Sequence, residues 1–352
     1  MTVAICAYNR TDTLRESLQS VLNQTYKDMR IVVIDDCSTK DIKSVVDSFG
    51  DDRLEYIRNE KNLGLVDNWN RAFDICGTEF LNIFHDDDRM FPWMIEKLVA
   101  AFENDASAAL VLSSRFHELG HSSVECPEGT PGRHFEKNEF IFWLCEKGGN
   151  PIVCPSAMFR KAAMDEGDMR FRPEVGLAAD VYFWLEASNR GLPMYVLNFP
   201  VLEYRLHPGS CTNTGGAEKW SFTHKMLDDF ISSLRLGCDM RLLRENFAKA
   251  GIKYAVLSMG EDFGIGLVNE VRGKLRDEMG WETSDGAVNK IVSVNYLKES
   301  FVSAAEGRTG FGEYRERRAN LRRKGFRLPF GKQAEWFYKY VVIPKISGKP
   351  RA

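Results

Sequence analysis

The chain has 352 residues and a formal net charge of −3, with 44% hydrophobic and 28% charged residues. This length and composition are ordinary for a globular protein with two domains, or with one large domain and an appendage. No apolar run reaches the roughly 18 residues of a membrane span, and the N-terminus lacks the regions of a secretory signal, so we expect a cytoplasmic protein. The eight cysteines show no C-x-x-C spacing, which argues against a zinc site and predicts reduced thiols.

Positive charge is concentrated at the C-terminal end of the chain. Residues 315–352 contain twelve Lys or Arg and two acidic residues, a net charge of +10, whereas residues 1–314 have a net charge of −13. The basic residues flank the aromatic segment 336–343. Such a tail can make peripheral contact with an anionic membrane surface, although the composition favours a basic helix that packs its aromatic residues on the acidic body. We expect no nucleic-acid partner.

Short apolar runs alternate with helical periodicity through the first half of the chain. This alternation predicts an α/β fold with a mainly parallel sheet and helices on both faces. The expected strands are 3–7, 30–34, 54–58, 80–84, 108–112 and 201–206. The expected helices are 11–22, 42–49, 66–76, 93–104, 140–144 and 178–190.

The second half of the chain has a different pattern. Residues 214–216 form a Thr-Gly-Gly sequence typical of a linker, and apolar residues then recur at a spacing of three to four with no strand alternation, which predicts a helical appendage. We therefore expect three regions. They are an α/β domain over 1–215, a helical region over 218–314 and the basic aromatic tail over 315–352.

Polar residues follow four of the expected strands. In parallel sheets ligands bind outside the carboxyl ends of the strands, so the loops 8–10, 35–36, 62–64 and 86–88 are expected to line one crevice. The last of these loops is the acid triplet, three consecutive Asp residues at 86–88 that repel one another unless a cation lies among them. The triplet predicts a site for a hard divalent metal, with an acidic turn that caps the next helix as the alternative.

The loops contain neither a dinucleotide fingerprint nor a P-loop. A phosphate would then be neutralised by a metal that carboxylates hold. Asp36 is placed to accept a hydrogen bond from a base or a ribose, and Tyr8 to stack on a base. An Asx-turn for Asp36 and a core aromatic for Tyr8 are the alternatives.

Taken together, these motifs resemble the family 2 inverting glycosyltransferases of GT-A fold. The resemblance covers about residues 1 to 212, in order. It rests on Thr2-Val-Ala-Ile-Cys-Ala-Tyr-Asn-Arg10, Val33-Ile-Asp-Asp-Cys-Ser38, Asn62-Leu-Gly64, His85-Asp-Asp-Asp88 with Pro92, Ala179-Asp180 and Tyr204-Arg-Leu-His207. It implies a Rossmann-like GT-A domain that binds a nucleotide-diphosphate sugar, most often a UDP-sugar, and a Mn²⁺ or Mg²⁺ ion.

The resemblance also implies roles for single residues. Asp180 falls on the catalytic base, which takes the proton of the acceptor hydroxyl, although a helix N-cap is the alternative reading of that residue. Asp36 would accept from the base, and Asp87 would bind the metal. The further nucleotide-binding candidates are Ala7, Tyr8, Arg10, Asn70 and Asp86, and the further metal-ligand candidates are Asp88 and His207.

Two positions depart from the family pattern. His85 stands where the motif usually begins with an acid, so either His85 replaces that acid or Asp86 and Asp88 together serve as the D-x-D pair. An Arg-Asn pair that helps to hold the diphosphate in many members is Trp69-Asn70 here.

The implied reaction is inverting transfer of one sugar, of hexosyl or N-acetylhexosaminyl type, to a hydroxyl of a glycan or lipid-linked glycan, as in surface polysaccharide biosynthesis. One base and one metal suffice for this displacement, whereas glycoside hydrolysis needs paired acids. The principal alternative is a catalytically inactive nucleotide-sugar-binding or glycan-binding protein of the same fold. A phosphoryl-transfer enzyme with an Asp-x-Asp motif is disfavoured, because Asp88 is followed by Arg89-Met90.

Overall fold

The computed structural model describes residues 1–118, 124–205, 216–259, 264–293, 297 and 311–326. The chain forms two compact units. The N-terminal unit comprises Met1–His207 and Asp229–Cys238, and the C-terminal unit comprises Pro208–Asp228 and Asp239–Ala352.

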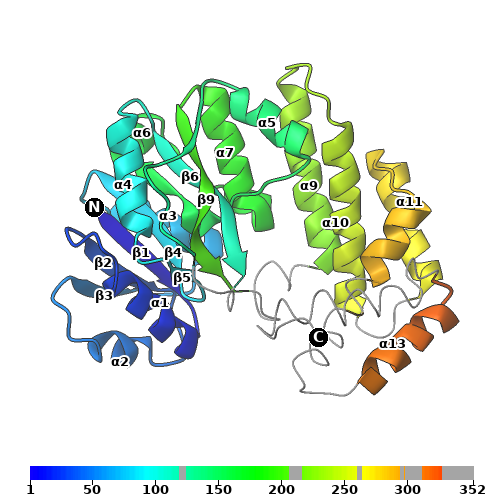
Figure 1. Ribbon diagram of the computed structural model, residues 1–352, viewed down its shortest axis with the longest axis horizontal. Coiled ribbons are helices and arrows are strands. Elements are labelled where there is room, and N and C mark those ends of the chain that lie inside the picture. Colours follow the sequence, from blue (N-terminus) through cyan, green and yellow to red (C-terminus); the bar gives the residue numbers. More distant parts are fainter. Residues whose placement is uncertain (119–123, 206–215, 260–263, 294–296, 298–310, 327–352) are drawn as a thin grey trace, which may run out of the picture. The chain divides into compact units, whose positions relative to one another are not determined.

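The N-terminal unit contains a nine-stranded sheet (Figure 1). Along its hydrogen-bonded path the strand order is β3-β2-β1-β4-β8-β6-β9-β5, and β7 pairs with β9. The strands are β1 (Thr2–Ala7), β2 (Arg30–Asp35), β3 (Leu54–Arg58), β4 (Phe80–His85), β5 (Arg89–Met90), β6 (Leu110–Glu118), β7 (Gly132–Phe135), β8 (Met158–Arg160) and β9 (Met194–Tyr204).

The first four strands in the order β3-β2-β1-β4 are all parallel. Their carboxyl ends therefore lie at one edge of the sheet, as the strand-end argument requires. Beyond β4 the sheet is mixed: β8 runs antiparallel to β4 and β6, and β5 and β7 run antiparallel to β9. The predicted α/β class is confirmed, and the parallel half of the sheet is the half that carries the four loops.

The helices of this unit cover both faces of the sheet. Val3, Ile5 and Ala7 of β1 belong to one buried cluster with residues of α1 (Asp12–Leu22), α2 (Ile42–Asp47) and α4 (Met94–Asn104). Alternate residues of a strand point to opposite faces. Cys6 accordingly lies toward α3 (Leu65–Ile75), where its thiol donates to the Asn68 carbonyl.

The second face is covered by α3 and α7 (Ala179–Arg190) over an aromatic core. Phe73 of α3 and Phe183 of α7 stack at 6.3 Å between ring centroids, and Phe159 and Phe171 pack between them. This core fixes the start of α7, where Asp180 lies. The remaining helical segments are α5 (Glu139–Lys147), η1 (Cys154–Ser156), α6 (Lys161–Glu166) and η2 (Pro173–Ala178).

The C-terminal unit is helical in its described residues, as the periodicity predicts. Residues of α9 (Gly216–Ser233), α10 (Arg241–Met259) and the turn after α11 (Ile265–Met279) form its aromatic core, and α13 (Phe311–Arg323) follows. His224 stacks on Phe247 at 4.2 Å, and Trp281 packs against both. The expected aromatic segment of the basic tail lies outside the described residues.

Membrane-spanning segments are absent from the part of the chain that the structure describes. None of its helices is both long enough and apolar enough to cross a bilayer.

Candidate active site

The loop after β1 brings Tyr8, Asn9 and Arg10 to the carboxyl edge of the sheet. Ala7 is buried, whereas Tyr8 is 46% exposed and is therefore not a core aromatic. Asn9 has a left-handed backbone (φ 58°), and its side-chain oxygen accepts from the backbone N–H groups of Thr39 and Lys40 at 2.8 and 3.3 Å. Asparagine tolerates this conformation better than most residues. The resulting turn directs the next residue, Arg10, toward the acid triplet.

Asp86 is held by the first loop. Its Oδ2 accepts from the Tyr8 N–H at 3.0 Å, and its Oδ1 accepts from Arg10 Nη1 at 2.8 Å. The same Arg10 nitrogen lies 3.2 Å from Asp87 Oδ2. Burial nevertheless raises the pKa of Asp86 to about 6, against the lowering effect of Arg10. The predicted convergence of loops 8–10 and 86–88 therefore exists in the structure.

Asp88 is the most deeply buried residue of the acid triplet. Its Oδ1 accepts from the Arg205 N–H at 2.9 Å, but its Oδ2 has no hydrogen-bond partner among the described residues and lies 3.7 Å from His85 Nδ1. Burial and the Asp87 carboxylate raise the pKa of Asp88 well above its usual range. A buried carboxylate oxygen without a donor is an energetic cost, and a cation would remove it.

His85 completes a set of potential metal ligands. Ligand atoms of His85, Asp87 and Asp88 lie within 4.8 Å of one another. Burial lowers the pKa of His85 to about 4, so its imidazole is neutral at pH 7 and keeps a lone pair for a metal. The ring stacks on Trp69 at 5.4 Å with an interplanar angle of 6°. The donor set of two carboxylates and one imidazole therefore fits a divalent ion.

None of the three acids caps α4. The N-cap of α4 is Trp93, with no side-chain cap hydrogen bond. The alternative of an acidic capping turn is therefore wrong. Arg205, the residue after β9, binds to the triplet: its Nε donates to the Asp87 carbonyl at 2.7 Å, and its Nη2 pairs with Glu16 at 2.5 Å.

Asp36 organises the loop before α3. Its Oδ1 accepts from the Leu63 N–H and from Asn59, at 2.8 and 2.9 Å, and its Oδ2 accepts from the Gly64 N–H at 2.9 Å. Asp36 is 3% exposed. Because Oδ2 accepts one hydrogen bond, it keeps one lone pair for a further donor. The carboxylate also sets the shape of the 59–64 turn.

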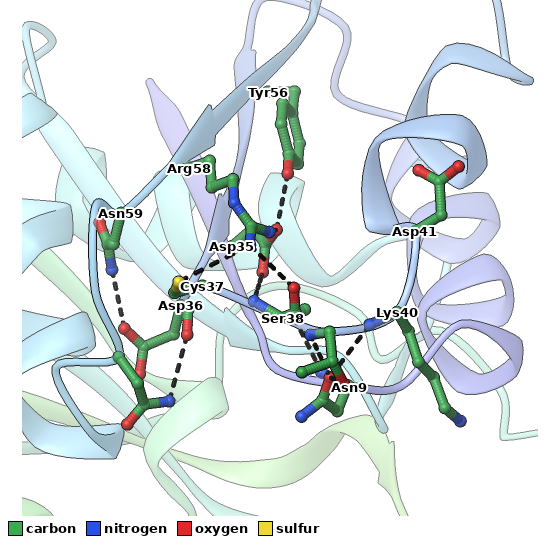
Figure 2. A network of polar contacts seen from close by, with 12 residues as sticks. Asn9, Asp35, Asp36, Cys37, Ser38, Lys40, Asp41, Tyr56, Arg58 and Asn59 are labelled. Atoms are coloured by element: carbon green, nitrogen blue, oxygen red, sulfur yellow. Dashed lines mark hydrogen bonds and ion pairs between the residues drawn. The ribbon is translucent and has the colours of Figure 1, made fainter.

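A second polar network lies behind this loop and was not predicted from the sequence (Figure 2). Asp35 is fully buried, and its Oδ2 accepts from Tyr56 and Arg58 at 2.6 Å each, while its Oδ1 accepts from the Ser38 N–H. Burial alone would raise the pKa of Asp35, but these hydrogen bonds outweigh it and hold the pKa low. Ser38 in turn accepts from the Asn9 N–H at 2.9 Å, so the network fixes the first loop.

Asn70 connects α3 to the segment before α7. Its amide donates to the Phe171 carbonyl and accepts from the Phe171 N–H, both at 2.8 Å. These two bonds engage both the nitrogen and the oxygen of the side-chain amide. The structure thus gives Asn70 a contact with the chain itself at the position where the family pattern places a diphosphate contact.

Asp180 lies in the first turn of α7 and does not cap it, because the N-cap is Ala178. Its Oδ1 accepts from the Val181 N–H at 2.8 Å, and burial raises the pKa of Asp180 to about 6. Burial raises the pKa of the Cys154 thiol, and the nearby Asp180 and Asp88 carboxylates raise it further. The predicted base and the acid triplet therefore both lie within electrostatic range of this thiol. The remaining candidate, His207, lies outside the described residues.

The chain is similar in sequence to known proteins. The family model described as Glycosyl transferase family 2 matches residues 2–167. The UDP-Glc:alpha-D-GlcNAc-diphosphoundecaprenol beta-1,3-glucosyltransferase WfaP of Escherichia coli is 31% identical over 210 residues, which cover 60% of this chain and 78% of the relative. An uncharacterized glycosyltransferase of Methanocaldococcus jannaschii is 32% identical over 213 residues, which cover 58% of this chain and 70% of the relative.

A solved structure has the same fold. Staphylococcus aureus TarS 1-349 in complex with UDP-GlcNAc matches with a TM-score of 0.55 and 17% identity, over 96% of this chain and 91% of that chain. This likeness confirms the expected GT-A architecture. Together with the sequence relatives and the family model, it shows that the chain belongs to glycosyl transferase family 2 and is a glycosyltransferase.

Proposed function

We propose that this glycosyltransferase transfers a single sugar from a UDP-sugar to a hydroxyl of a lipid-linked glycan, with inversion at the anomeric carbon and with the help of a divalent metal. The Escherichia coli relative is named as a UDP-glucose enzyme with a lipid-diphosphate acceptor, which supports the donor and acceptor classes.

One observation carries the proposal. Asp180, a carboxylate with a raised pKa, and Asp88 of the acid triplet, with its buried, unpartnered oxygen, both lie within electrostatic range of the buried Cys154 thiol. Direct displacement at an anomeric carbon needs a proton acceptor on the side of the acceptor hydroxyl and neutralisation of the leaving diphosphate. In this proposal Asp180 supplies the first of these functions, and the acid triplet with its metal supplies the second.

In this scheme residues of the chain itself transfer the proton and bind the nucleotide. Asp180 takes the proton of the attacking hydroxyl at its carboxylate. Its pKa of about 6 keeps it ionised at pH 7 while making it a stronger base than an exposed Asp. Arg10 and the Tyr8 N–H hold Asp86 in place, and the exposed Tyr8 ring offers a stacking surface for uracil. The lone pair left on Asp36 Oδ2 accepts from the base.

His85, Asp87 and Asp88 would hold the metal, which supplies positive charge to the leaving diphosphate when bound. A set that includes an imidazole favours Mn²⁺ over Mg²⁺, because Mg²⁺ prefers oxygen ligands throughout. His207 remains a proposed additional ligand.

The decisive experiment is the Asp180→Asn variant, tested for sugar transfer and for UDP-sugar binding. We expect turnover to fall by about 100-fold or more, the usual contribution of general base catalysis, while donor affinity stays within a few-fold. For the wild type, kcat should fall as the pH drops below about 6, because protonation removes the base. Glu174→Gln, an exposed acid before α7, is the matched control.

Near-normal turnover in Asp180→Asn would show that Asp180 is not the general base. Binding of UDP-sugar by the wild type without any turnover, over a panel of glycan-lipid acceptors, would favour the inactive binding protein instead.

A further inference from the structure

The C-terminal unit contains a cavity of about 750 Å³ that no step of sugar transfer uses. Its walls are the beginning of α10, the end of α11 and the turn 280–284. We propose that this cavity binds a phosphate or diphosphate ester. The inference does not depend on the proposed function, because it concerns only residues of the C-terminal unit.

Four arginines line the cavity, and the chain holds each of them in place. Arg244 Nε donates to Asp228 at 3.0 Å, and Arg272 donates to the Thr283 carbonyl at 2.5 Å and pairs with Asp285. Arg276 donates to Asp277 and Arg241 to Asp239. The partly buried guanidinium groups of Arg244 and Arg272 are therefore oriented before a ligand arrives, which lowers the entropic cost of binding.

Two buried donors in the lining lack a partner. Trp281 is 1% exposed and Thr283 is 7% exposed, and neither Trp281 Nε1 nor Thr283 Oγ1 has a hydrogen-bond partner among the described residues. Indole and guanidinium groups can only donate hydrogen bonds, and a hydroxyl can donate as well. The guanidinium groups in the lining therefore favour a ligand that carries several acceptors, as an oxyanion does.

Helix termini add to this preference. Arg241 begins α10. Ser284 caps the helical residues 285–293, with its Oγ accepting from the Ala287 N–H at 3.2 Å and its carbonyl accepting from the Val288 N–H at 3.0 Å. Both Arg241 and Ser284 line the cavity. The positive ends of helix dipoles favour anions, and phosphate groups in particular.

The charges of the lining agree with an anionic ligand. The four arginines outnumber Glu245 and Glu282 in the lining, although an aspartate outside the lining pairs with each arginine and offsets much of its charge. The aspartates that hold the arginines are not among the lining residues. The volume lies within the range of sites for small organic ligands, so the phosphate is expected to carry an organic group.

The test is hydrogen exchange of the full chain with inorganic pyrophosphate, in EDTA so that no metal supports a diphosphate elsewhere. We expect slower exchange in the peptides that cover the start of α10 and residues 280–288. Arg276→Gln should weaken this binding about tenfold, since it removes a donor to a charged acceptor. Lys274→Gln, an exposed residue of α11 outside the lining, is the matched control and should change affinity less than about twofold.

A second experiment distinguishes two sources of the phosphate group, a lipid headgroup and a soluble ester. Vesicles of phosphatidylcholine, with and without phosphatidic acid, are mixed with the wild type and with Arg276→Gln. Preferential binding to phosphatidic acid that Arg276→Gln weakens assigns a lipid headgroup, whereas pyrophosphate binding without vesicle preference assigns a soluble ester. Equal pyrophosphate affinity of the wild type and Arg276→Gln, or no protection of the 280–288 peptides, would overturn the proposal.

Discussion

Arg10 is the side chain that links two members of the acid triplet. Its Nη1 lies 2.8 Å from Asp86 and 3.2 Å from Asp87, so one guanidinium serves two carboxylates. Asp88 accepts from the Arg205 N–H, and its second oxygen is unpartnered among the described residues. A divalent ion between Asp87 and Asp88 would supply the positive charge that this buried oxygen lacks.

This arrangement predicts that metal binding stabilises the folded chain. Mn²⁺ should raise the unfolding temperature, with an effect that grows with the logarithm of its concentration above the dissociation constant. Asp87→Asn should weaken Mn²⁺ affinity at least about tenfold, because it removes a charged ligand. Asp67→Asn, an exposed acid on α3, is the control. Equal Mn²⁺ stabilisation of the wild type and Asp87→Asn would exclude Asp87 as a ligand.

Gly64, before α3, has a backbone conformation that other residue types adopt only with strain. Its backbone (φ 87°, ψ 164°) lies in a region that is essentially restricted to glycine, although an added Cβ would meet no atom within 4 Å. Gly64→Ala should therefore lower the free energy of unfolding by about 1–3 kcal/mol through backbone strain alone. It should also weaken donor binding, because the Gly64 N–H holds Asp36.

Chemical denaturation of Gly64→Ala and Gly77→Ala provides the comparison. Gly77 has equally open surroundings and no positive φ, so its substitution should change stability by less than about 1 kcal/mol. Equal losses of stability in Gly64→Ala and Gly77→Ala would contradict the prediction that backbone strain destabilises Gly64→Ala.

At the scale of elements, the ends of β2 and β3 form a unit. Asp35 and Arg58 are the last partners in the parallel register of these strands, and the hydrogen bond between them closes the ladder. Arg58→Met leaves the buried Asp35 carboxylate with fewer donors and should lower the free energy of unfolding, although the 43% exposure of Arg58 means that solvent screens part of the interaction. Asp35→Asn combined with Arg58→Met should cost less than the sum of the single changes.

The pH dependence of stability gives an independent check of this pair. The folded-state pKa of Asp35 is lowered, so its contribution is fully present above the unfolded pKa and is lost as pH falls through the folded value. The wild type should therefore lose more stability on acidification than Asp35→Asn does. Parallel stability curves for the two proteins in acid would contradict the assignment.

The same elements show what the sequence can and cannot predict. The strands β1 to β4 follow from apolar runs, and their shared carboxyl edge brings together Arg10 and the acid triplet. The short strands β5, β7 and β8 carry no periodicity of their own and exist through pairing with distant strands. The Asp35–Arg58 pair depends on register, and the contact of Arg205 with Asp87 joins residues 118 apart. Such contacts are tertiary, so local patterns do not reveal them.

At the scale of the whole molecule, the two compact units suggest separate responses to ligands. In calorimetry of the full chain we expect two unfolding transitions, of which UDP with Mn²⁺ raises only one. Pyrophosphate in EDTA should raise only the other, because the arginine-lined cavity lies within the C-terminal unit. A single transition that both ligands shift would show that the units unfold together.

The buried Cys154 thiol near Asp88 and Asp180 has a consequence for chemical labelling. Thiolates, and not thiols, react with alkylating and oxidising reagents. Burial and the surrounding carboxylates raise the pKa values of both Cys6 and Cys154, so these two sulfurs stay protonated and inert although they lie beside the site. Cys126, in contrast, is exposed to solvent. A maleimide dye should therefore attach at Cys126 and leave the sulfurs beside the acid triplet unlabelled.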